Sequence, residues 1–448
     1  MIRKITDAVV LFFREYLPST YVLALILTIL VFLAGVVFTD QGFMGMVNVL
    51  GNGMWGLLAF TMQIVLSLVF AHALANAPSV LKLLRKLARI PKTRTQAVLF
   101  VSFSSLVCTY IHWGFGLVAG ALLAKEIATL NSGKKIDYPL LVAAAYSGNI
   151  MRGPSSNVFL GPSSAGHVAE KFVGVIPLSE TLFSIENIIL SILLFIGIPI
   201  LYKLMQPDEK NSLEIKVDAA EIERVKSEIA VANVKVDKKH LTFSEKLDEY
   251  PIIQYILAAL FAIFLFIYFS KQTSFNLSLD VLNLLFLVLG LIAHKTPSAY
   301  AKAIKEATKT ADGIILQFPF YAAIMVMLRD TGMSTAIAEF FVSISTARTL
   351  PVFSFLAASV INVFIPSAGG LWAIQGPIML EAAKLLGANE AAVIVGMGWG
   401  DSWTSQIQPF WALPLLAIAG LDVNDIMGYC FMVLLLSGVL ITGTLLIM

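Results

Sequence analysis

Two polar stretches interrupt apolar parts of the chain, and each carries one charged side chain. Arg152 lies in the first, beside Gly153-Pro154, and Asp401 lies in the second, residues 399–409. A planar guanidinium can bind a carboxylate through two parallel hydrogen bonds. A carboxylate surrounded by hydroxyl and amide oxygens can ligate a cation or carry a proton. The chemistry that these residue types indicate is the binding of a small anion next to a cation.

Both charges have alternative interpretations. A charged side chain deep in an apolar sequence is costly, so it normally faces the protein interior and has a function. Arg152 can clamp a substrate carboxylate, or it can form an internal salt bridge to Asp401 or Glu126. Asp401 can ligate sodium, carry a coupling proton or neutralise Arg152, and we favour a coupling-ion role.

The candidate site residues come from the two polar stretches and from two glycine-containing segments, 112–116 and 365–370. Tryptophans that cluster there with glycines favour a small, partly apolar pocket for an acyl chain. The substrate-binding candidates are His112, Trp113, Gly114, Arg152, Ser155, Ser156, Asn157, Ser367, Gly369, Trp403 and Thr404. The coupling-ion candidates are Ser147, Asn149, Asn362, Asp401, Ser402 and Ser405, with possible sodium ligation around Asn149 and Asp401. We expect no other cofactor.

The composition places these residues in a membrane. Of the 448 residues 58% are hydrophobic and only 13% are charged, with a mean hydropathy of +0.83. Apolar runs of about 20 residues, the length that crosses a bilayer as a helix, recur from end to end. The net charge of +2 suggests no nucleic-acid partner, and the two cysteines are too far apart to form a metal or disulfide motif. The sequence therefore predicts an all-α, multi-pass membrane protein in contact with lipid.

The distribution of Lys and Arg predicts the topology, because basic residues accumulate in cytoplasmic loops. Placing the N-terminus and segments 82–94, 125–135, 203–246 and 295–309 inside accounts for 25 of the 31 basic residues. Segment 97–130 then has cytoplasmic charge at both ends, which indicates a re-entrant helical hairpin, or two crossings with a tiny outer turn, centred on residues 112–116. Segment 351–382 is interpreted as a second hairpin that enters from outside.

The second half of the chain repeats the first. Gly148-Asn149 followed by Pro162 matches Gly400-Asp401 followed by Pro414, and each pair lies in a predicted broken helix, 139–169 and 391–419. The predicted domains are a first repeat, 1–204, a cytoplasmic loop, 205–250, a linking helix, 251–279, and an inverted second repeat, 280–448. Broken helices at matching positions of two inverted halves indicate the central site of a transporter.

At several motifs the sequence resembles the bacterial short-chain fatty acid transporter family. The motifs are Trp113-Gly114-Phe115-Gly116-Leu117-Val118, His294-Lys295-Thr296-Pro297, Gln317-Phe318-Pro319-Phe320-Tyr321, Gln375-Gly376-Pro377, Gln408-Pro409-Phe410-Trp411-Ala412-Leu413-Pro414 and Asp425-Ile426-Met427-Gly428-Tyr429. The resemblance implies cation-coupled uptake of a small monocarboxylate across the bacterial inner membrane, with a cytoplasmic N-terminus. It also implies a scaffold that dimerises and an elevator-type transport domain, about 97–169 with 352–419.

Three positions depart from that family's pattern, which has Asn in place of His112, a glycine-rich stretch in place of 152–157, and Glu in place of Asp401. Another small carboxylate is therefore an open alternative. A sodium/proton antiporter is a second, although only one intramembrane acid is evident. An intramembrane hydrolase using His112 with Ser155 or Ser156 is a third, and a passive channel a fourth; neither explains the predicted hairpins and repeats.

Overall fold

The computed structural model describes residues 18, 20–215, 242–272, 277–408 and 411–448. Within these ranges every regular element is helical. The bounds in the first half are α2 Thr20–Phe38, α3 Gly42–Gly53, α4 Leu58–Ala75, α5 Pro78–Leu87, α6 Arg94–Ile111, α7 Trp113–Leu130, α8 Tyr138–Tyr146, η1 Ser147–Ile150, α9 Asn157–Ser163, α10 Glu170–Val173 and α11 Ile185–Leu204. Those that follow are η2 Glu209–Asn211, α13 Phe243–Asp248, α14 Pro251–Ser270, α15 Leu279–His294, α16 Pro297–Thr308, α17 Asp312–Asp330, α18 Met333–Ile344, α19 Leu350–Phe364, α20 Ala368–Leu386, α21 Glu390–Thr404, α22 Ala412–Ala419 and α23 Val423–Leu445.

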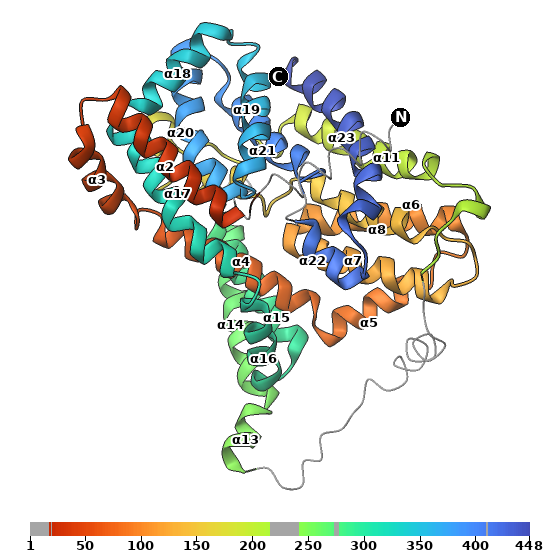
Figure 1. The fold of residues 1–448 in the computed structure, drawn as a ribbon. Helices are drawn as coiled ribbons and strands as arrows, with labels where there is room; N and C mark the ends of the chain where they lie inside the picture. Colours follow the sequence, from red (N-terminus) through yellow and green to blue (C-terminus); the bar gives the residue numbers. More distant parts are fainter. Residues whose placement is uncertain (1–17, 19, 216–241, 273–276, 409–410) are drawn as a thin grey trace.

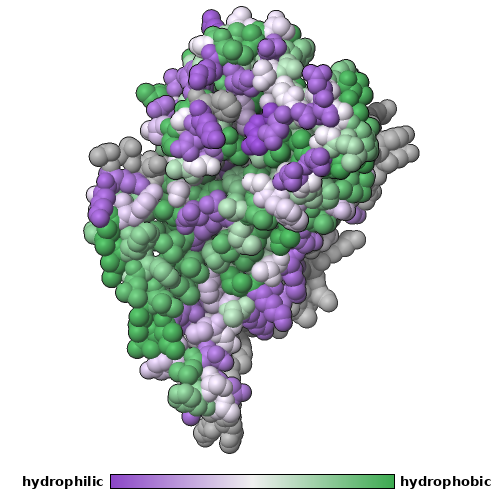
Figure 2. Space-filling model, turned by 90° about the vertical axis from the view of Figure 1, so that its left-hand side faces the viewer, coloured by the Kyte–Doolittle hydropathy of each residue, from purple (hydrophilic) through white to green (hydrophobic). Residues whose placement is uncertain are grey.

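Seven helical stretches in the described residues are long and apolar enough to cross a bilayer, which confirms the predicted fold class. The least buried are Tyr21–Phe38 and Phe243–Ser270, with 22% and 17% of their most apolar windows inside the protein. Helix α14 exposes large aliphatic and aromatic side chains along most of its length. Figure 2 shows a continuous hydrophobic area low on the face that carries this helix. Such a surface is stable against lipid tails or against another protein chain.

The helices form two groups that meet at the centre of the molecule (Figure 1). One group packs α2, α3 and α17 together, packs α4 on α15 and α16, and packs α14 on α15. The other packs α6, α7, α8 and α11 with α21, α22 and α23, and α19 lies along α21. Contacts of α4 with α7, and of α17 with α20, connect the two groups.

Two helix pairs occupy the segments predicted as hairpins. Only His112, in an extended conformation, separates α6 from α7. Residues 365–367 separate α19 from α20, and the Ser367 hydroxyl accepts a hydrogen bond from the Gly370 amide at 3.2 Å. Each tip is thus closed by a side chain that satisfies a backbone N–H at the start of the second helix.

Helical structure is also interrupted in both segments that were predicted to contain a broken helix, 139–169 and 391–419. Helix α8 tightens into η1, the chain leaves the helix at Met151 and turns at Pro154-Ser155, and α9 begins at Asn157. A side chain at Gly153 would overlap the Tyr110 carbonyl of α6, so only glycine fits there. In the second half α21 ends at Thr404 and α22 begins at Ala412. Pro409 and Phe410, in this second break, lie outside the described residues, as does much of the predicted cytoplasmic loop.

The order of elements is the same in the two halves: a long helix and a short one, a helix pair, a broken helix and a final long helix. The linking helix α14 ends at Ser270, earlier than the predicted residue 279. That the second half is inverted across the membrane, and that the two groups move against each other, stay predictions.

Candidate functional site

The charged residues of the two broken helices meet in the interior. Arg152 donates from Nε and Nη2 to Oδ2 of Asp401, at 3.0 and 2.6 Å. Its Nη1 donates to the Asn149 carbonyl at 2.9 Å. Both side chains are buried, at 9% and 2% exposure. The other predicted partner, Glu126, pairs instead with Arg85, at 3.2 Å.

The pair has a specific electrostatic consequence. Removing one member of a buried ion pair costs about 3–5 kcal/mol, because the remaining charge is stranded in a medium of low polarity. Both bonds to Asp401 end on Oδ2, and no described residue is recorded as donating to Oδ1. Because Asp401 and Arg152 both line a cavity, a ligand that enters the cavity reaches the pair. An anion in the cavity can therefore compete with Asp401 for the guanidinium of Arg152.

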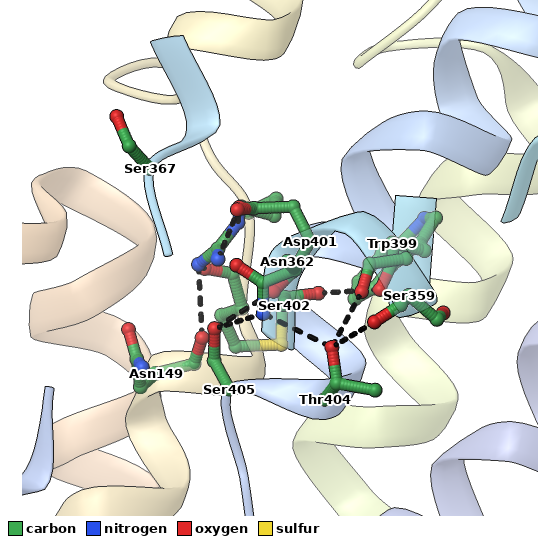
Figure 3. A network of polar contacts seen from close by, with 12 residues as sticks. Asn149, Ser359, Asn362, Ser367, Trp399, Asp401, Ser402, Thr404 and Ser405 are labelled. Atoms are coloured by element: carbon green, nitrogen blue, oxygen red, sulfur yellow. Dashed lines mark hydrogen bonds and ion pairs between the residues drawn. The ribbon is translucent and has the colours of Figure 1, made fainter. Parts of the chain in front are cut away.

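A second polar network lies next to Asp401 and ties α19 to the end of α21 (Figure 3). Nδ2 of Asn362 donates to the hydroxyls of Thr404 and Ser405, both at 3.0 Å. These hydroxyls donate onward to the carbonyls of Ser359, at 2.9 Å, and Asp401, at 2.7 Å. Oδ1 of Asn362 is buried without a hydrogen-bond partner. The network therefore fixes the break in α21 and presents one unused amide oxygen.

The cavity, of about 330 Å³, lies between the two groups of helices and is of the size that binds a small ligand. One wall, from α2, α4 and α17, includes Tyr21, Ile64, Leu68, Gln317 and Phe318. The opposite wall comes from the first broken helix, both helix-pair tips and Trp411, and includes Trp113, Met151, Arg152, Ser367 and Asp401. The exposed surface of the lining is therefore largely apolar and aromatic. Its polar groups come from the stretch around Arg152, from the second tip at Ser367, and from Thr310, Asp312 and Gln317.

Three side chains at the polar end have buried atoms without a hydrogen-bond partner. They are Asn149 Nδ2, Ser156 Oγ and Asn157 Oδ1, and all three residues line the cavity. Leaving a buried polar atom unpaired costs about 1–3 kcal/mol, so a bound ligand that pairs with it recovers free energy. Each of the two amides carries one donor group and one acceptor group, and a hydroxyl can act as either. Together these side chains provide donors and acceptors for an oxyanion and its hydration shell.

His112 does not line this cavity. Its Nδ1 accepts from the backbone N–H of Gly114 at 3.2 Å and of Phe115 at 3.5 Å, so the ring proton belongs on Nε2. Nε2 contacts the Ser67 hydroxyl of α4 at 3.0 Å, and the ring packs on Phe286. His112 is thus a buried cap of α7. Its hydrogen-bond partner is neither Ser155 nor Ser156, so the geometry gives no support to the hydrolase alternative.

The remaining predicted residues divide between the cavity and the packed interior. Ser155, in the lining, accepts a hydrogen bond from the Trp113 amide at 3.1 Å. Gly114 faces Leu68, and Gly369 packs tightly against Ile64, both outside the lining. Trp403 is also outside it: Nε1 donates to the Leu434 carbonyl at 2.7 Å. Hydroxyls of three other candidates bond to backbone carbonyls: Ser147 to Ala144 and Ser402 to Trp399 within their own segments, and Thr404 to Ser359 of α19.

Sequence reasoning missed most of the wall formed by α2, α4 and α17. Gln317, Phe318 and Trp411 belong to motifs that carried the family resemblance, so that signal was available for them. Ile64 and Leu68 have no such signal, because apolar residues four apart on a membrane helix are typical of ordinary packing. Among the described residues no group of three or more His, Cys, Asp or Glu could hold a metal ion. A sodium ion near Asp401 would therefore be held by that one carboxylate together with hydroxyl, amide and carbonyl oxygens.

Comparison with known proteins gives the family. The family model described as "Short chain fatty acid transporter" matches residues 1–448. A protein of Escherichia coli (strain K12), named for a proposed role in short-chain fatty acid transport, is 40% identical over 98% of both chains. A similarly named protein of Haemophilus influenzae (strain ATCC 51907 / DSM 11121 / KW20 / Rd) is 37% identical over 98% of both chains.

A solved structure supports the fold. The YdaH transporter of Alcanivorax borkumensis, whose description reports an unusual topology, aligns with a TM-score of 0.51 and 14% identity, over 95% of this chain and 98% of that one. With seven candidate membrane helices and a cavity between two broken helices, these matches establish a multi-pass membrane transporter, and the chain belongs to the short-chain fatty acid transporter family.

Proposed function

We propose that this protein carries short-chain fatty acids or similar small monocarboxylates across the bacterial inner membrane by symport with a cation. The observation that carries the proposal is the guanidinium of Arg152, held in the wall of a largely apolar cavity of about 330 Å³. A monocarboxylate has one charged end and one apolar end, and this lining provides for both. A second carboxylate on the substrate would find no second cation in the lining that the described residues form, and it would face the acidic side chain of Asp312.

Partner exchange at the ion pair provides a coupling step. The substrate carboxylate takes the Nε and Nη2 donors of Arg152, and Asp401 is released. A released carboxylate in a buried site is unstable alone, so it takes up a proton or a sodium ion. The oxygens of Ser405 and Asn362 lie in the adjacent network and can complete the coordination of sodium. Substrate and cation then bind together or not at all.

The position of the cavity supports an elevator-type movement. Thr310, Asp312 and Gly313, at the beginning of α17, and Tyr21, at the beginning of α2, line the cavity. Charge distribution predicts that these helix ends are cytoplasmic. We infer that this conformation faces inward, that the group containing α6–α9 and α19–α23 moves, and that the other group is the scaffold and forms a homodimer through exposed surface such as that of α14.

The decisive experiment is uptake into proteoliposomes of labelled butyrate, acetoacetate and succinate, with sodium and proton gradients imposed separately. We expect saturable uptake of C2–C6 monocarboxylates driven by one of the two gradients, with little competition from succinate. Better competition by succinate or citrate than by butyrate would show that the monocarboxylate assignment is wrong. Sodium-driven proton release without any carboxylate would favour the antiporter alternative.

A labelling experiment tests the movement. In a background without Cys108 and Cys430, the variant Ala368→Cys places a thiol in the cavity at the tip between α19 and α20. An impermeant thiol reagent should reach it from the cytoplasmic side in the conformation described here, and from outside in the alternative one. The ratio of the two rates should change with substrate. Labelling from one side alone, whatever the ligand, would contradict an elevator.

A further inference from the structure

Helix α5 directly follows the membrane-spanning helix α4 and connects the two helix groups. Ser79 donates to the Ala293 carbonyl at the end of α15, at 3.5 Å, and Arg85 pairs with Glu126 of α7. Figure 1 shows α5 running from the end of α4 toward the pair α6 and α7. Helix α5 therefore touches the proposed scaffold at one end and the proposed moving group at the other.

The two sides of α5 differ sharply. Leu84 and Ala88 are buried, and Arg85 is paired with Glu126. The opposite side of α5 carries two exposed cations, Lys82 and Lys86, four residues apart, and the exposed Arg89 follows in the turn just beyond the end of the helix at Leu87. Next to these cations are two large apolar side chains, Leu83 in the helix and Ile90 just beyond it, which are 55% and 56% exposed.

A row of cations next to a row of exposed apolar side chains, at the end of a membrane helix, is the arrangement found where helices lie in the membrane interface. Lys and Arg immediately beside a membrane span attract anionic headgroups. We propose that this side of α5 binds anionic phospholipid, with the headgroup phosphate on Lys82, Lys86 and Arg89 and the acyl chains against Leu83 and Ile90.

Helix α16 provides a matched control. It also exposes three cations, Lys302, Lys305 and Lys309, and Lys309 pairs with Glu306 of the same helix. Unlike α5, it carries no exposed large apolar side chain among its residues Pro297–Thr308. A charge effect alone predicts lipid binding at both helices, somewhat weaker at α16 because Glu306 pairs with Lys309, whereas a site that requires both features predicts binding at α5 alone.

The test uses the purified full-length protein and phosphatidylglycerol, with phosphatidylcholine as the neutral probe, and measures retained lipid by native mass spectrometry. The triple variant Lys82→Gln, Lys86→Gln, Arg89→Gln should lose affinity for phosphatidylglycerol by roughly a hundredfold, at about fivefold for each cation. The variant Lys302→Gln, Lys305→Gln, Lys309→Gln should change by less than about threefold. Lys82→Arg with Lys86→Arg should retain binding and show that the helix tolerates substitution.

Localisation is tested independently by a spin label on Leu83→Cys. Labelled phosphatidylglycerol should contact it more often than labelled phosphatidylcholine in the same liposomes. Equal losses in the α5 and α16 variants, or no loss in the α5 variant, would overturn the proposal. Cross-linking of Leu83→Cys to a second copy of the chain, with no enrichment of lipid, would overturn it as well.

Discussion

The two helix-pair tips occupy corresponding positions in the two halves, but they use their capping side chains differently. At the first tip the His112 ring is fully buried and both its nitrogens are engaged, at Gly114 and Ser67. At the second, Ser367 lines the cavity, and within the described part of the chain its hydroxyl acts only as an acceptor, for the Gly370 amide. In Figure 3, Ser367 lies apart from the polar network. The first tip is therefore attached to α4 by an imidazole whose two nitrogens are both hydrogen-bonded, whereas the second tip has a hydroxyl proton that can be donated to a ligand.

The largest effect, a loss of folding stability, should follow from His112→Ala. It removes a cap, leaves the Ser67 hydroxyl without its partner and opens space against Phe286, so we expect a loss of about 2–4 kcal/mol in stability. The apparent Km of the protein that remains folded should change little. Thermal unfolding in detergent and uptake normalised to folded protein measure the two effects. His112→Asn restores an oxygen cap and should recover part of the stability; a large rise in Km in this variant would place His112 in the substrate site.

A smaller effect, on transport, is expected from Ser367→Ala. A neutral hydrogen bond to substrate contributes about 0.5–1.5 kcal/mol, so the Km for butyrate should rise roughly twofold to tenfold. Ser367→Thr keeps the hydroxyl and should remain within about twofold of the parent. If Ala and Thr variants lose equally, the hydroxyl does not contact substrate and the proposed difference between the tips fails.

A change in chain-length preference is expected from Leu68→Ala. Leu68 lines the cavity one turn from Ile64, so truncating it makes room for additional methylenes. Each buried CH₂ contributes about 0.8 kcal/mol, so hexanoate should gain about fourfold over butyrate for each additional methylene accommodated. Leu74→Ala, on the same helix but away from the cavity lining, is the control. An unchanged ratio of kcat/KM values for C4 and C6 substrates would exclude Leu68 from the acyl site.

The smallest effect should come from Trp403→Phe. This indole contacts Phe355 and Gly438 and donates to Leu434, and it lies outside the cavity lining. We expect a Km within about twofold of the parent and a stability loss of about 1 kcal/mol from the lost hydrogen bond. A tenfold rise in Km with unchanged stability would return Trp403 to the substrate site, where the sequence placed it.

The overall class was predictable because the bilayer leaves few choices. Long apolar runs must form helices, and Gly153-Pro154 must interrupt one. The ion pair was among the alternatives considered for Arg152 and Asp401, since two buried charges of opposite sign are stable only together. The direction in which a side chain points was not predictable. Trp403 and Ser367 both lie in polar, glycine-containing stretches, and only the rotation of each helix decides which one faces the cavity. Ile64 and Leu68 line the cavity because of the way in which the two groups of helices pack against each other. No local sequence pattern specifies that packing.

The central claim is that substrate carboxylate replaces Asp401 at Arg152. It is tested most directly by measuring butyrate binding and cation-driven uptake in Arg152→Gln, Asp401→Asn and the double variant. Each single variant strands one buried charge, whereas the double variant removes both, so folding stability should recover in the double variant. The account predicts that binding stays lost in both variants that lack Arg152, and that Asp401→Asn binds butyrate but loses its dependence on the cation gradient. Recovery of coupled transport in the double variant would contradict it, and would show that the pair only stabilises the fold.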